Sequence, residues 1–176
     1  QLLYLASTQI DASRTMQNDD FVIDSLASLA KKTGFVSQNF SEATAQALAP
    51  LEPFAAYVIT QAIQRYGQNE RSLFSFLNAR GRNSLSEYEG KIYQLQCCYD
   101  YIYYNFYSYL KEANADSMQW SSMQVAVERV EGQLWDTKTD LVDAIKLVKA
   151  IGLLNLFGNA SFKMSREDTA LYAKTA

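Results

Sequence analysis

Apolar residues along most of this chain recur at steps of three and four positions, which is the spacing of one face of an α-helix. Polar residues fill the positions between them, and the chain holds only 2 Pro and 7 Gly to interrupt the pattern. No segment alternates apolar and polar residues between hairpin turns, and no unit of about 20 to 50 residues repeats. The pattern therefore predicts an all-α protein built as a multi-helix bundle.

The boundaries of the predicted helices come from residues that start or stop helices. Asn18 and Asn69 are good N-caps, and Pro53 suits a first helical turn. Ser165 and Asp168 have the spacing of a capping box. The predicted ranges are 2–10, 19–34, 41–49, 53–67, 69–81, 89–111, 117–133, 136–151 and 165–176.

The longest unbroken predicted helix with a full apolar row is 89–111, and it also contains most of the tyrosines. Its apolar row is Ile92, Leu95, Tyr99, Ile102, Phe106 and Leu110. Aromatic and β-branched residues are dense enough here for a strand, but the length and the 3.6-residue period favour a helix. The polar run 82–86 just before it is the best internal linker. We therefore expect one or two helical units, and if two, subdomains 1–81 and 82–176.

The composition is that of a globular protein. Of 176 residues, 48% are hydrophobic and 20% charged, which is enough to build a sizeable core. The formal net charge of -3 gives no overall electrostatic reason to bind nucleic acid or an anionic membrane. No apolar run reaches the roughly 18 residues of a membrane span, so none is expected. We interpret Cys97 and Cys98 as buried thiols in a reducing compartment, which predicts a cytoplasmic location.

Several classes of chemistry are excluded by missing residues. The chain has no His, which removes Ser-His and Cys-His nucleophiles and the usual zinc and iron ligands. It also lacks a G-x-x-x-x-G-K-[ST] phosphate loop and a G-x-G-x-x-G motif after a strand. Its carboxylates are spaced as on solvated helix faces. We predict no catalytic centre, metal site or cofactor in this chain. Because it begins at Gln1 without Met or a signal peptide, we expect an excised piece of a longer protein.

The segment 66–77 carries the most specific candidate site. It joins two predicted helices through Gly67 and places Arg71 in the first turn of the second, after its cap Asn69. Free backbone N–H groups and the helix dipole give this position a positive potential that favours an anion. The alternative, which the spacing alone favours, is an arginine that pairs with Glu70 or with a neighbouring helix.

Two blocks give a resemblance to a known family. They are GQNERSLFSFL at 67–77, preceded by a Pro-led apolar helix, and LVKAIGLLNLFG at 147–158. With these blocks, residues 50–165 resemble the middle of large bacterial P-loop ATPases of the AAA+ or STAND type found near phage-defence genes. The resemblance implies that a nucleotide-binding core precedes Gln1 and that residues 1 to about 80 form its helical lid. It further implies that the segment from 136 onwards resembles the start of a winged-helix domain.

In such lids, an arginine early in one helix reaches the nucleotide phosphates. Arg71 matches that position, and Asn69 at the same helix start is the second candidate contact. The resemblance therefore implies that ATP and Mg²⁺ bind to the longer protein, which would be an ATPase in an antiviral defence setting. This chain would not be the catalytic part.

Seven tyrosines between positions 93 and 109 cannot all face one core. Tyr101, Tyr104 and Tyr107 are the candidates for a contact surface, because tyrosine buries area while its hydroxyl stays in water. The readings are core and ordinary surface positions, a protein contact, or stacking on bases. Few Lys or Arg residues lie among these tyrosines, so nucleic acid is the least favoured partner.

The leading hypothesis is a non-catalytic regulatory and interaction region of a larger P-loop ATPase, with Arg71 near the nucleotide phosphates. Its expected partners are other domains of the same chain and a further protein. The alternative is a purely structural α-helical interaction domain in which Arg71 only forms an ion pair. A stand-alone enzyme ranks third.

Overall fold

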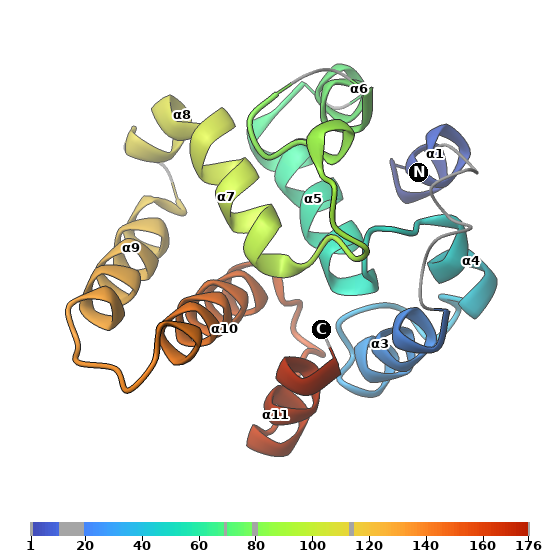
Figure 1. The fold of residues 1–176 in the computed structure, drawn as a ribbon. Coiled ribbons are helices and arrows are strands. Elements are labelled where there is room, and N and C mark those ends of the chain that lie inside the picture. The colour runs from blue at the N-terminus through green and yellow to red at the C-terminus, as the bar shows by residue number, and fades with distance from the viewer. Residues whose placement is uncertain (1, 11–19, 69, 79–80, 113–114, 176) are drawn as a thin grey trace.

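The computed structural model describes residues 2–10, 20–68, 70–78, 81–112 and 115–175. These residues form α-helices and one short 3-10 helix, with no β-strand among them, which confirms the predicted all-α bundle (Figure 1). The helices are α1 Leu2–Gln9, α3 Asp20–Lys32, α4 Glu42–Ala47, α5 Pro53–Tyr66, α6 Glu70–Asn78, the 3-10 helix η1 Leu85–Glu87, α7 Leu95–Asn105, α8 Tyr107–Lys111, α9 Ser117–Glu131, α10 Lys138–Phe157 and α11 Arg166–Thr175.

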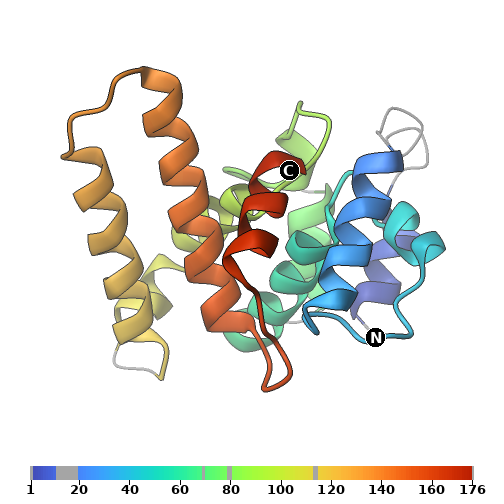
Figure 2. The same cartoon turned by 90° about the horizontal axis from the view of Figure 1, so that it is seen from below.

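Helix α5 lies at the centre of the bundle (Figure 1). It packs against α1, α3 and α6 on one side and against α7 and α10 on the other. Helices α9 and α10 form an antiparallel hairpin at one edge, and α11 packs on α3 (Figure 2). The sequence explains this central position, because α5 itself carries apolar residues on nearly every face. Ten of its fourteen residues are buried.

The buried apolar side chains form one continuous cluster that includes residues from α1 to α11. Leu85, within the run predicted to be a linker, is buried in this cluster, and the neighbouring Ser84 is buried as well. The division into subdomains 1–81 and 82–176 stays a prediction, as does the winged-helix resemblance of the second part, which the fold does not confirm. In the part of the chain that the structure describes, no helix is both long and apolar enough to cross a membrane.

Local helix signals are confirmed at several ends. The amide of Phe35 donates to the carbonyl of Ala30 and the amide of Gly34 donates to that of Lys31, which together make a Schellman motif after α3. Gly34 has a φ of 71°, as this motif requires. The capping box before α11 is present as well, because Ser165 Oγ accepts from the Asp168 amide and Asp168 Oδ2 accepts from the Ser165 amide. The predicted caps Asn18 and Asn69 lie outside the described residues.

The prediction of one helix over 89–111 is wrong. Residues 89–94 are not helical, α7 begins only at Leu95, and the helix breaks again at Phe106, whose φ and ψ are -116° and 17°. The cause of the late start is a backbone pairing with the segment before α5. The Tyr93 amide donates to the Pro50 carbonyl at 2.7 Å, and the Glu52 amide donates to the Tyr93 carbonyl at 3.2 Å. These bonds hold Tyr93 in an isolated β-bridge with Leu51, which a helical conformation would not allow.

The predicted end of the helix 136–151 is also wrong, since α10 continues through Gly152 to Phe157. A Cβ atom at Gly152 would lie 2.4 Å from Met123 Sδ. Gly152 therefore permits α9 and α10 to approach closely, and it does not stop the helix.

Replacing Gly34 by Ala tests the turn after α3. The added Cβ would lie 2.6 Å from the backbone oxygen of Ser161, and φ is positive, so we expect a loss of roughly 1–3 kcal/mol in the free energy of unfolding. Denaturant unfolding measures it. Gly132→Ala is the matched control: Gly132 has helical backbone angles and its nearest Cβ contact would be an ordinary 3.5 Å. Equal effects of the two substitutions would contradict the role given to Gly34.

Candidate functional site

Arg71 lies in the first turn of α6, as predicted, and its side chain is exposed. The turn before it is closed by two bonds: the Arg71 amide donates to the Gln68 carbonyl, and the Gln68 amide donates to Ser72 Oγ at 2.8 Å. Gly67 is required here because a Cβ would lie 2.7 Å from Ser72 Oγ. The Arg71 guanidinium forms no ion pair within 4.0 Å and no hydrogen bond with any described residue. The predicted second contact, Asn69, lies outside the described residues.

The exposed face of α6 also carries an aromatic ring. Phe74 lies one turn after Arg71 and is 57% exposed. The opposite face, with Leu73, Phe76 and Leu77, is buried against the bundle. Helix α6 therefore offers a cation and an exposed aromatic ring together, on the side that faces away from the core.

The three tyrosines predicted as contact residues differ in their exposure to solvent. Tyr101 is only 4% exposed and packs edge-on against Phe76, with ring centroids 4.7 Å apart. It is therefore a core residue and not part of an exposed surface. Tyr104 and Tyr107 are exposed, at 46% and 45%. The sequence could not separate Tyr101 from Tyr104, because both lie within α7 and only the contact of Tyr101 with Phe76 of α6 shows which of them is buried.

Tyr104 and Tyr107 form an aromatic surface together with Tyr103, whose ring contacts both at 5.6 and 5.4 Å. The Arg82 guanidinium lies over the Tyr104 ring at 3.7 Å, and Lys111 Nζ lies 5.3 Å from the Tyr107 ring. These are cation–π contacts, and they bring two positive charges to a surface where the local sequence shows few.

Glu52 is the titratable group that sequence reasoning missed. It precedes Pro53 at the N-cap of α5 and is fully buried. Its Oε1 accepts a hydrogen bond from the Leu95 amide at 2.9 Å and another from the Tyr172 hydroxyl at 2.5 Å. Its Oε2 has no hydrogen-bond partner among the described residues. A Glu before a Pro usually indicates an exposed helix start, so only the tertiary structure reveals this burial.

Burial raises the pKa of Glu52 to about 8, and the hydrogen bonds from Tyr172 and Leu95 oppose part of that rise. The carboxyl is therefore largely protonated at neutral pH. No Lys or Arg within the described ranges forms an ion pair with it, so no counter-ion compensates the charge that it would carry when ionised.

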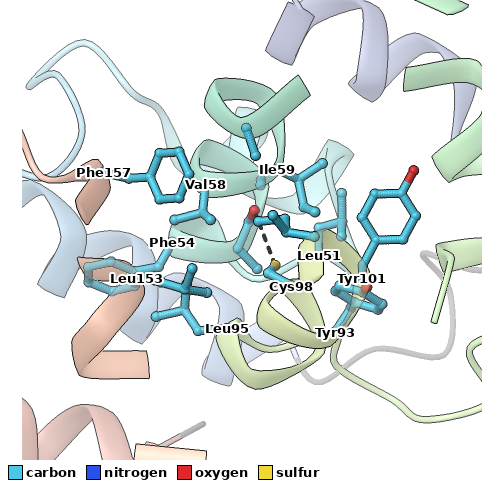
Figure 3. Close-up of a cluster of buried hydrophobic side chains, with 14 of the residues drawn as sticks. Leu51, Phe54, Val58, Ile59, Tyr93, Leu95, Cys98, Tyr101, Leu153 and Phe157 are labelled. Carbon is cyan, nitrogen blue, oxygen red and sulfur yellow. Dashed lines mark hydrogen bonds between the residues drawn. The ribbon is translucent and has the colours of Figure 1, made fainter. Parts of the chain in front are cut away.

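The two cysteines are free thiols, and Cys98 is buried as predicted while Cys97 is half-buried. Cys98 Sγ points at α5 and lies 3.6 Å from the Ala55 carbonyl oxygen, within the apolar cluster of Figure 3. Burial raises the pKa of both thiols, which keeps them protonated at neutral pH and makes them poor nucleophiles. No group of three or more Cys, Asp or Glu side chains in the described part of the chain is arranged to hold a metal ion.

A second polar network fixes the end of α5 to the start of α9. Tyr66 donates to Asp116 Oδ2 at 2.7 Å, Arg65 pairs with the same oxygen at 3.0 Å, and Trp120 Nε1 donates to the Tyr66 hydroxyl at 3.1 Å. These bonds join the two helices, so we assign the network to holding them together.

Comparison with protein-family models, with curated proteins and with solved structures finds no match to this chain.

The pH dependence of stability tests the protonation of Glu52. In the unfolded chain its pKa returns to about 4.5, so between about pH 4.5 and 8 the folded protein keeps a proton that the unfolded chain releases. Glu52 therefore makes the free energy of unfolding fall as pH rises, by up to about 1.4 kcal/mol per pH unit in this window. We expect Glu52→Gln to remove this slope in denaturant titrations.

Glu89→Gln serves as the control for that experiment, because Glu89 is exposed. It should leave the pH dependence of the wild-type protein in place. Parallel pH profiles for the wild type and Glu52→Gln would show that Glu52 does not hold the extra proton.

Proposed function

We propose that this chain is a non-catalytic helical region of a larger P-loop ATPase, in which Arg71 contacts the nucleotide phosphates held by a neighbouring core. The observation that supports this proposal is the outer face of α6. An exposed arginine without a described partner, at the start of a nine-residue helix and beside an exposed Phe74, is free to meet another domain. An arginine used only for an internal ion pair would have its carboxylate nearby.

The proposed mechanism is electrostatic. A guanidinium can stabilise the charge that develops on a transferring phosphoryl group when the lid closes, and it loses this contact when the lid opens. The positive end of the α6 dipole has the same sign and adds to the effect. Helix α6 packs on α1, α5 and η1. A displacement of α6 would therefore change its contacts with α5, the central helix of the bundle.

The second candidate function is a structural α-helical interaction domain with no role in nucleotide binding. The aromatic surface of Tyr103, Tyr104 and Tyr107 favours it, because exposed tyrosines and arginines are common in protein interfaces. The two functions differ in whether Arg71 affects turnover. They do not differ in whether the bundle binds a protein.

The first prediction of this proposal concerns the chain by itself. Because it contains no phosphate loop, we expect it neither to hydrolyse ATP nor to bind it tightly. Calorimetry with ATP and Mg²⁺ measures this. Micromolar binding by the chain alone would reveal a complete site, and the region 67–71 would be the first place to search for it.

The second prediction concerns the longer protein. We expect Arg71→Ala to change the free energy of unfolding by no more than about 0.5 kcal/mol, because the side chain is exposed. We also expect it to reduce ATP turnover by about 10³-fold, the range found for arginines that contact a transferring phosphoryl group. Melting temperature and steady-state ATP hydrolysis are the two measurements.

Arg129→Ala is the matched control, because Arg129 is exposed on α9 and belongs to no candidate site. It should change neither property. Unchanged turnover in Arg71→Ala would favour the structural interaction domain. A large loss of stability together with a matching loss of turnover would indicate that Arg71 is paired and buried in the longer protein.

A further inference from the structure

Helix α11 is anchored to the bundle at its first residues. Just before it, the Lys163 amide donates to the Thr33 carbonyl at 2.8 Å. In its first turn, Asp168 Oδ1 pairs with Lys32 Nζ at 2.6 Å. Hydrogen bonds from Lys32 and Ser165 lower the pKa of Asp168, so the carboxylate side of this ion pair is lost only in acid. The N-terminal end of α11 is thus fixed to the C-terminal end of α3.

The far end of α11 is held in a different way. Tyr172 is 4% exposed and points into the core, where its ring meets Phe54 edge-on with centroids 5.5 Å apart. Its hydroxyl donates to Glu52 Oε1. The other residues on this part of the helix are mostly exposed, and Leu171 is 50% exposed. The ring contact and the hydrogen bond of Tyr172 are therefore the main interactions that hold the C-terminal half of α11 on the bundle.

The Glu52 carboxyl, which accepts the hydrogen bond from Tyr172, is buried and has no counter-ion among the described residues. From α7 the Leu95 amide faces it, and from α11 the Tyr172 hydroxyl does. The other titratable groups close enough to interact with its charge are Cys97 and Cys98 of α7 and Tyr88, all of them acids that become negative when they ionise. Ionised Glu52 would thus be a buried anion, stabilised by two donors and by no cation in the described ranges.

We propose that α11 is a proton-dependent latch: it is closed over the Glu52 carboxyl when that group is protonated, and its C-terminal half opens when the group ionises. Opening withdraws the Tyr172 ring, which covers the carboxyl from the α11 side, and admits water to it. The anchored N-terminal end of α11 acts as the hinge. The whole of α11 has ten residues, so its released half is too short to stay helical once it leaves the bundle.

The latch has a direction in pH and a structural consequence. Because the closed form holds the proton more tightly, the open fraction rises with pH, by up to tenfold per unit up to about pH 8. Opening also exposes the buried face of α3. Leu26 and Leu29, at 0% and 3% exposed, already line a groove of about 480 Å³ that Leu171 borders from α11. The latch thus controls access to an apolar surface, whether or not the chain serves an ATPase.

Amide hydrogen exchange of the whole chain tests the latch. After correction for the intrinsic exchange rate at each pH, we expect protection of residues 170–175 to fall severalfold or more per unit between about pH 6 and 8. At every pH in this range α5 should stay more protected than 170–175, because the opening is local, although the protection of α5 also falls as the free energy of unfolding does. In Glu52→Gln the protection of 170–175 should no longer depend on pH.

Two further variants separate the latch from a general loss of stability. Tyr172→Phe keeps the ring but removes the hydroxyl, so protection of 170–175 should be lower and still fall with rising pH. Lys32→Met removes the anchor at the other end, so protection should drop by a factor that is the same at every pH. These two variants keep the test decisive even if Glu52→Gln fails to fold.

The proposal is overturned by any of three results. Protection of 170–175 in the wild type could be independent of pH. It could depend on pH equally in a folded Glu52→Gln variant. Or α5 and α11 could have equal protection at every pH, which would mean that both exchange only when the whole bundle unfolds and that α11 has no opening of its own.

Discussion

The start of α5 and the segment before α7 are joined by three hydrogen bonds on which the arrangement of the bundle depends. The Tyr93 amide donates to the Pro50 carbonyl, the Glu52 amide donates to the Tyr93 carbonyl, and the Leu95 amide donates to the Glu52 carboxyl. The last of these satisfies a free N–H group in the first turn of α7, so a side chain from α5 caps a helix that begins 43 residues later. This contact sets where α7 starts. It thereby sets which of its side chains face α5 and α10.

The Glu52 carboxyl both holds elements of the bundle together and limits its stability. Two donors satisfy one oxygen, and their loss would leave a polar group without partners in the core, at a cost of about 1–3 kcal/mol each. The other oxygen has no described partner, and a full charge could not be held there without a cation. Protonation resolves this conflict at neutral pH. The structure therefore depends on a proton as well as on packing.

The sequence predicted those features that neighbouring residues determine. The first turn at Pro53 and the capping box at Ser165 both act within a few positions, and each is present. The start of α7 could not be predicted, because the bonds that fix it come from residues about 40 positions away. The predicted end of the helix before Gly152 was wrong for a similar reason. Only the approach of Met123 from α9 explains why a glycine lies inside α10.

The candidate site shows the same limit. Arg71 could be placed at a helix start from local signals alone, whereas its exposure could not. The separation of buried Tyr101 from exposed Tyr104 depends on where α7 begins and ends, and therefore on the contact between Tyr93 and the start of α5. Glu52 was overlooked because a carboxylate next to a proline is ordinary in sequence and unusual only when buried.

The two proposals, for Arg71 and for α11, meet at one place in the core. On the buried side of the helix that carries Arg71, Phe76 packs against Tyr93 with ring centroids 5.5 Å apart. The Glu52 amide donates a hydrogen bond to the Tyr93 carbonyl. The Glu52 carboxyl in turn accepts a hydrogen bond from the Tyr172 hydroxyl of α11. Contact alone does not establish coupling, which requires an element with two arrangements that both sites can bias. Helix α11 is the element of this bundle for which two arrangements are proposed, and this chain of contacts reaches it through Glu52. A displacement of α6 that changed the burial of Glu52 would therefore change the pH at which the latch opens. The pH-dependent part of such an effect would disappear in a protein whose residue 52 cannot ionise, because the two arrangements would no longer differ in proton binding.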